Sequence, residues 1–161
     1  MKHSPDFSTD GNVHGRILVG IDFSHPGRHA LIRARALARD GGGRLMALHV
    51  IDGHGLEEIA RLVEMPLEEV KERLWRERRH QLAELLVEID AEEGEAPAME
   101  AVVAWGVPFE EIVRKAADVS SSLIVLGTMG RSADLQRALF GSTAEKVLRS
   151  APCPVLCVPT D

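Results

Sequence analysis

Three features are scarce in this sequence, and each absence excludes a class of protein. No run approaches the roughly 20 apolar residues of a membrane helix, so we expect no membrane insertion. Cysteine occurs only twice in 161 residues, which fits free thiols in a reducing compartment. Basic residues are not in excess: the formal charge is -6 and the pI about 5.6. Since a nucleic-acid-binding domain is expected to carry a basic face, no nucleic acid partner is predicted.

The two cysteines, Cys153 and Cys157, are expected on one short strand. Residues four apart on a strand point to the same face but lie too far apart to form a disulfide. Both are therefore predicted to be free thiols.

The composition indicates one soluble globular domain. Hydrophobic residues make up 45% of the chain and charged residues 27%, and a chain of this size buries roughly two-thirds of its unfolded surface without disulfides. Residues 1–14 are polar and are predicted to form a flexible tail, with the domain at 15–161. This tail has no apolar core like that of a signal peptide, so we expect a cytoplasmic protein.

Strand and helix patterns alternate along the chain. Short apolar runs predict strands, and apolar residues at three- and four-residue steps predict helices. This alternation predicts an α/β fold: a doubly wound, Rossmann-like, five-stranded parallel sheet of order 3-2-1-4-5 with helices on both faces. The predicted strands span residues 16–21, 44–51, 99–104, 123–126 and 155–158, and the predicted helices span 28–39, 67–93, 108–119 and 142–149, with Ser24 as the N-cap of the first.

Strands 1 and 4 are adjacent in this order, and their connections leave toward opposite faces. Sheets of this type bind ligands beyond the carboxyl ends of the strands at such a switch point. The segments that meet there begin at Asp22 and Gly127. Gly127 and Gly130 punctuate the second segment, and Gly141 precedes a helix. Glycine lets backbone N–H groups approach a phosphate closely, and a helix N-terminus favours an anion.

Four segments of the chain carry a family resemblance. They are ILVGIDFS at 17–24, ALHVID at 47–52, WGVPFEEIV at 105–113, and the set GTMGR, GSTAEKVL and APCPVLCVP between 127 and 159. In this order and at these separations they resemble the universal stress protein family, over about residues 15–160. The resemblance implies an ATP-binding homodimer acting in stress response or regulation, with an unknown protein partner.

The resemblance also implies a binding site for ATP or a related adenine nucleotide, accompanied by Mg²⁺. Asp22 corresponds to a position near the adenine and ribose, and Val50 to one whose backbone contacts the adenine edge. The remaining positions would hold the ribose and phosphates: Gly127, Gly130, Gly141, Ser142 and Thr143. The final strand, as in the family, is expected to pair with its copy in a dimer.

Each of these assignments has an alternative. Asp22 could simply cap the turn after the first strand, and the glycines could be ordinary turn residues. Ten residues separate Gly130 from Gly141, one more than in nucleotide-binding members. The chain could therefore be a member that binds no nucleotide and acts as a dimeric protein-interaction module.

Catalysis and a resident metal find little support in the sequence. No residue is a convincing general base near the expected phosphates, so hydrolysis is predicted to be slow or absent and no catalytic residue is named. His25 and His29 have helical metal spacing but no evident third ligand, so no metal site is predicted. His49, inside a strand, is expected to be a partly buried structural histidine.

Overall fold

A computed structural model describes residues 15–95, 97–128 and 141–160 of the chain. Ten helices and strands fall within these ranges. The strands are β1 (Arg16–Ile21), β2 (Arg44–Ile51), β3 (Met99–Trp105), β4 (Leu123–Thr128) and β5 (Val155–Pro159). The helices are α1 (His25–Gly41), α2 (Leu56–Leu62), α3 (Leu67–Glu93), α4 (Pro108–Asp118) and α5 (Ser142–Ser150).

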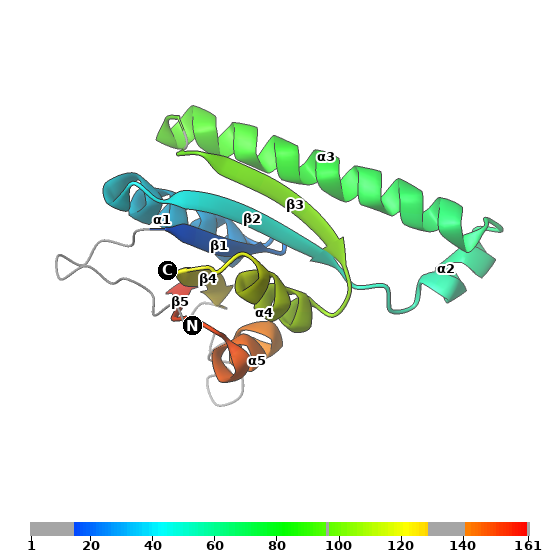
Figure 1. The fold of residues 1–161 in the computed structure, drawn as a ribbon. Coiled ribbons are helices and arrows are strands. Elements are labelled where there is room, and N and C mark those ends of the chain that lie inside the picture. The colour runs from blue at the N-terminus through cyan, green and yellow to red at the C-terminus, as the bar shows by residue number, and fades with distance from the viewer. Residues whose placement is uncertain (1–14, 96, 129–140, 161) are drawn as a thin grey trace.

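The five strands form one parallel sheet of order β3-β2-β1-β4-β5. Helices α1 and α3 cover one face, and α4 and α5 cover the other (Figure 1). The predicted fold class and strand order are therefore confirmed. Among the helices of the described ranges, none is long and apolar enough to cross a membrane.

Alternating side chains of the central strands supply two separate cores. On β1, Ile17, Val19 and Ile21 pack toward α1 and α3, whereas Leu18 packs toward α4 and α5. Because both faces of a parallel sheet are buried, the strand reads as a nearly continuous apolar run. This explains why RILVGI has no polar alternation despite being a strand.

Helix α1 begins at a side-chain cap and ends at a glycine. The Ser24 hydroxyl accepts a hydrogen bond from the Gly27 N–H at 3.1 Å, which confirms Ser24 as the N-cap. The helix ends at Gly42, whose φ of 66° is left-handed. It starts three residues earlier than predicted, because Pro26 is accommodated in the first turn, where no intrahelical N–H is needed.

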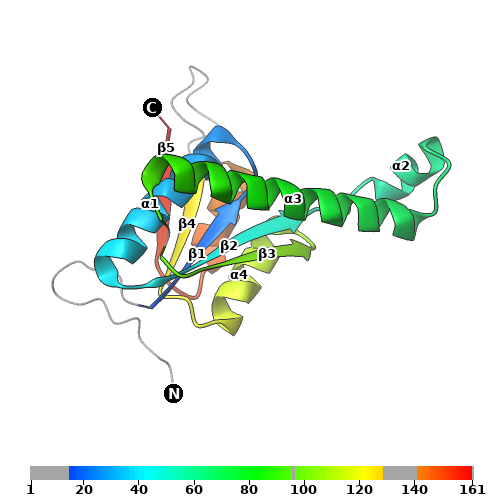
Figure 2. The ribbon, with the colours of Figure 1, turned by 90° about the horizontal axis from the view of Figure 1, so that it is seen from above.

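Arginines of α1 hold the carboxyl-terminal half of α3. Arg35 is only 1% exposed; it pairs with Asp90 and donates to the Gly94 carbonyl at 2.6 Å. Arg28 pairs with Glu92 at 2.6 Å. The other half of α3 projects with α2 beyond the sheet (Figure 2). One end of α3 is thus fixed against the sheet layer while the other extends from it.

The structure corrects three details of the predicted elements. Helix α2 was not predicted: it is seven residues long and buries only Leu56 and Ala60, so it leaves a weak periodic signal. Strand β4 continues through Gly127 to Thr128, because both residues pair with β5. Cys153 precedes β5 instead of lying on it, while Cys157 is in the strand; both are free.

The carboxyl end of β4 lies directly against the start of α1. A Cβ on Gly127 would stand 2.3 Å from the Pro26 carbonyl carbon and 2.7 Å from the Gly27 nitrogen. No real Cβ tolerates such distances, and backbone atoms inside a capped helix turn cannot move aside. Gly127 is therefore required by packing, whatever ligand binds nearby.

Replacing Gly127 by alanine is expected to lower the free energy of unfolding by at least about 1–3 kcal/mol, because the backbones of β4 and α1 must separate. Chemical denaturation measures this loss. Gly53→Ala is the matched control: its added Cβ would meet nothing closer than 3.9 Å, so stability is unchanged or slightly raised. A Gly127→Ala protein as stable as the parent would contradict the packing argument.

Candidate functional site

A cleft opens beyond the carboxyl ends of β1 and β4, on the face covered by α4 and α5. This is the switch point of the sheet, where neighbouring connections leave in opposite directions. Its walls come from five separate parts of the chain. The lining residues are Gly20, Ile21, Asp22, Gly27, Leu48, His49, Val50, Pro108, Ile112, Leu126, Gly127, Thr143 and Ala144.

The structure brings together most of the residues singled out in the sequence. Asp22, Val50, Gly127 and Thr143 all line the cleft. Gly141 and Ser142 immediately precede Thr143 at the start of α5. The prediction for Gly130 lies outside the described residues.

Asp22 both lines the cleft and organises the turn that follows β1. Its Oδ1 accepts hydrogen bonds from the Ser24 N–H at 3.0 Å and from the Ser24 hydroxyl. A Cβ on Gly27 would stand 2.5 Å from this same oxygen. The side chain nevertheless remains exposed. The capping role, which was the alternative for this residue, is thus present and leaves the carboxylate accessible from the cleft.

The N-terminus of α5 presents backbone donors beside the cleft. Gly141 adopts φ 71° and ψ 155°, a conformation that disfavours any residue with a Cβ, and it has no side chain with which to cap the helix. Residues Ser142 to Ala144 form the first turn, whose N–H groups have no intrahelical acceptor. The positive end of the helix dipole therefore lies next to Thr143, one wall of the cleft.

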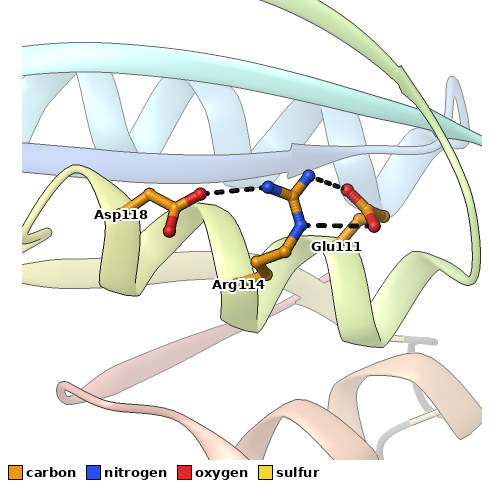
Figure 3. Close-up of polar contacts among 3 residues, drawn as sticks. All are labelled: Glu111, Arg114 and Asp118. Carbon is orange, nitrogen blue, oxygen red and sulfur yellow. Dashed lines mark hydrogen bonds and ion pairs between the residues drawn. The ribbon is translucent and has the colours of Figure 1, made fainter.

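The start of α4 forms another wall of the cleft, with Pro108 and Ile112, and an ion network on α4 lies beside the turn before it. Glu111 lies over Gly106, where an added Cβ would come within 2.7 Å of its side chain. Arg114 holds Glu111 and also pairs with Asp118 at 3.0 Å (Figure 3). The hydrogen bond that Arg114 donates to Glu111 raises the pKa of Arg114. This arrangement orients the first turn of α4, which carries Pro108 into the cleft.

His49 lies where β2 ends, next to the cleft residue Val50, and is only 8% exposed. Its Nδ1 is 2.7 Å from the Ile21 carbonyl oxygen. Because a carbonyl can only accept, Nδ1 carries the proton and Nε2 is left as an acceptor. Nε2 is buried and meets no hydrogen-bonding partner among the described residues. Sequence reasoning took His49 as structural; its unpaired nitrogen could not be seen from the sequence.

The environment of His49 favours the neutral ring. Burial lowers its pKa below the ordinary 6.5, and the hydrogen bond to Ile21 only partly opposes this. The ring of Phe23 packs on it with the centroids 4.5 Å apart. Phe23 itself has φ 61°, which is unusual for a residue with a bulky side chain. A strained residue at the end of β1 thus covers a neutral imidazole.

We expect nitrogen-detected NMR to find the His49 proton on Nδ1 and its pKa below 6.5. The folded state then binds fewer protons than the unfolded state once the pH falls below 6.5. The stability contributed by neutral His49 is complete above that pH and declines as the pH falls toward the folded pKa. A proton on Nε2, or a pKa of 6.5 or higher, would contradict the buried geometry.

Residues 14–159 match the universal stress protein family. The universal stress protein MJ0531 of Methanocaldococcus jannaschii is 31% identical over 150 residues, covering 91% of this chain and 83% of that protein. The solved structure of MJ0577 from the same organism is 26% identical, covers 91% of this chain and 96% of its own, and superposes with a TM-score of 0.70.

Two further structures share the fold at lower identity. A universal stress protein from Archaeoglobus fulgidus in complex with dAMP is 23% identical, with a TM-score of 0.60 over 90% of this chain and 97% of its own. A universal stress protein in complex with cAMP is 21% identical, with a TM-score of 0.56 over 92% and 98%.

Proposed function

The chain belongs to the universal stress protein family, and we propose that it binds an adenine nucleotide, ATP with Mg²⁺, in the cleft at the switch point. The observation that carries this proposal is the meeting of Asp22, Val50 and Gly127 with the uncapped start of α5 in one cleft. These residues come from four distant segments, and the fold alone assembles them.

The cleft has one apolar part and one polar end. Leu48, Ile112 and Leu126 supply an apolar surface suited to a flat adenine ring. Val50 offers its backbone at the rim, and the Asp22 carboxylate can accept from ribose hydroxyls. The phosphates would then lie at the N–H groups of the first turn of α5. Mg²⁺, when present, neutralises phosphate charge and is held mainly by the phosphates themselves.

Two proteins with the same fold support an adenine nucleotide as the class of ligand. Their structures are complexes with dAMP and with cAMP, both adenine nucleotides. They show that this fold accommodates such a ligand in those proteins. The residues that would do so in this chain are argued from its own cleft.

The bound nucleotide would regulate the protein and would not be hydrolysed as a source of energy. The ionisable residues among the described lining of the cleft are Asp22 and His49. Asp22 is engaged with Ser24, and the His49 ring points to the other face of the sheet. With neither placed as a base for an attacking water, hydrolysis is slow or absent. A regulatory role in stress response, through a protein partner in the cytoplasm, fits a protein that binds without turnover.

Thr143→Glu tests the position of the phosphates. A carboxylate in the first turn of α5 favours the helix dipole, so the fold is not weakened, but it repels the nucleotide. We expect calorimetry to show Mg-ATP binding weakened at least about 10-fold, which is 1.4 kcal/mol. Thr143→Gln, of similar size and no charge, is the matched control and retains most of the affinity.

Two results would overturn the nucleotide proposal. One is the absence of Mg-ATP binding by the folded parent protein at millimolar concentration, together with no adenine absorbance in denatured extracts. This result would favour the alternative, a dimeric interaction module without a nucleotide. The other is equal weakening by Thr143→Glu and Thr143→Gln, which would place the phosphates elsewhere.

The exposed edge of β5 supports the proposal of a homodimer. Within the described part of the chain, β5 pairs only with β4, so its other edge is open. Leu156 on this strand is 37% exposed. Pairing the edge with a second copy would satisfy its backbone groups and cover the apolar side chains.

A charge on this edge is expected to separate the subunits. Leu156→Lys should shift the protein from dimer to monomer in sedimentation velocity, because the charge would be buried between two copies. Val87→Lys, on the solvent side of α3 where Val87 is 68% exposed, is the control and leaves the dimer intact. A dimer that persists in Leu156→Lys would contradict pairing through β5.

A further inference from the structure

A second groove opens at the same end of the sheet but on the opposite face, beneath α3. It encloses about 520 Å³, within the range of small-molecule sites. It shares Asp22, His49 and Val50 with the nucleotide cleft but has its own walls. Its other lining residues are Phe23, Ile51, Asp52, Leu74, Arg78, Gln81, Glu84, Leu85 and Glu88.

His49 turns its ring toward this groove. Side chains alternate along β2: Leu45 and Ala47 pack toward α1 and α3, whereas Leu48 and Val50 pack toward α4 and α5. Position 49 therefore faces α3. Because its Nδ1 donates to Ile21, the buried Nε2 offers a lone pair that no described residue uses. Nε2 has almost no accessible surface in this structure, so a ligand reaches it only when a neighbouring side chain moves aside. The hydrogen bond formed then removes the cost of the unpaired acceptor.

Arg78 also lines this groove, and its charge has no carboxylate partner among the described residues. Its Nη1 donates to Gln81 Oε1 at 2.7 Å. In the described ranges, no carboxylate lies within 4.0 Å of its guanidinium, although four carboxylates line the groove. Arg78 and His49 both line the groove. The groove thus holds a cation that lacks an anionic partner and an acceptor that lacks a donor.

We propose that this groove binds a free basic α-amino acid. An α-amino acid carries a carboxylate and an ammonium on the same carbon atom, and these two groups suit Arg78 and the Nε2 of His49 respectively. The groove has further carboxylates at Asp52, Glu84 and Glu88, which favour a second positive charge on the ligand.

The three carboxylates keep free oxygens for such a charge. Asp52 accepts from the His54 N–H at 2.9 Å, and the Glu84 and Glu88 side chains are 59% and 65% exposed. Glu84 contacts His80, and Glu88 contacts Arg28 at 3.4 Å. Phe23, Leu74 and Leu85 offer apolar surface for the methylene groups of a lysine- or arginine-like side chain.

Other small ligands satisfy fewer of these groups. A polyamine would bring only positive charge and leave Arg78 without an anion. A simple carboxylate would meet the acidic groove and leave Nε2 without a donor. A neutral amino acid would bind the pair but not the outer carboxylates. Among these ligand types, only the basic α-amino acid supplies a partner for Arg78, for Nε2 and for the outer carboxylates.

The test uses the full chain without nucleotide and four ligands that differ by one group. L-lysine is compared with cadaverine, which lacks the carboxylate, with Nα-acetyl-L-lysine, which lacks the α-ammonium, and with L-norleucine, which lacks the side-chain ammonium. L-lysine is expected to bind, and each analogue to bind at least about 10-fold more weakly in calorimetry. L-lysine should also shift the His49 Nε2 resonance, since that nitrogen accepts its hydrogen bond.

Two variants separate the groove from general effects of charge. Arg78→Gln should weaken L-lysine at least about 10-fold and abolish the preference for L-lysine over cadaverine. Arg79→Gln is the matched control: Arg79 is the next residue of α3, does not line the groove and lies over Trp75 at 4.7 Å. It should leave both affinities unchanged.

Three results would overturn the proposal. The first is that L-lysine does not bind at 10 mM, a concentration about 100 times the dissociation constant of 0.1 mM that is typical of metabolite sites. The second is that cadaverine binds as tightly as L-lysine. The third is that Arg78→Gln and Arg79→Gln have equal effects. The second result would make the groove a polyamine site. Mg-ATP binding is measured separately on the same samples, so failure of the groove and failure of the nucleotide cleft are distinguishable.

Discussion

The contact on which the other features depend is the approach of β4 to the start of α1. Gly127 lies so close to Pro26 and Gly27 that any Cβ would overlap backbone atoms. This contact joins two segments about 100 residues apart and places the end of β4 beside the turn after β1. The cleft forms because the carboxyl ends of β1 and β4 are adjacent while the connections that follow them leave toward opposite faces of the sheet. The family resemblance places Gly127 at the ligand, but the packing of the fold requires a glycine there whether or not a ligand binds.

A second constraint is the register between β1 and β2. Ile21 pairs with His49, so the Ile21 carbonyl lies within reach of the imidazole and fixes its tautomer. The next residue, Val50, faces the opposite way and lines the cleft at the switch point. The side chains of two consecutive residues at one strand end thus point to opposite faces of the sheet. A shift of one residue in this register would exchange their faces and remove both arrangements.

Some of this could be predicted from the sequence. The alternation of strands and helices predicts the layers of the α/β fold, and the apolar runs predict the buried strands. Asp22 and Gly127 could be placed near each other because the topology brings the ends of adjacent strands to one edge, whereas Val50 and Thr143 followed from the family resemblance. Helix α2 could not be predicted, since seven residues with two buried side chains carry little periodicity. Pro108 and Arg78 were missed because their roles depend on how α4 and α3 pack across the sheet, which no local pattern records.

The two hollows differ in electrostatic character, and this difference bears on how they would act together. The cleft ends at the positive N-terminus of α5, whereas the groove is lined by four carboxylates and one guanidinium. The ligands we propose are accordingly of opposite charge, and Asp22 lines both hollows. A ligand in one hollow that moves Asp22 would change the affinity of the other hollow, and this coupling is reciprocal. Such a protein could combine two metabolic signals by binding alone, which needs neither hydrolysis nor a catalytic base.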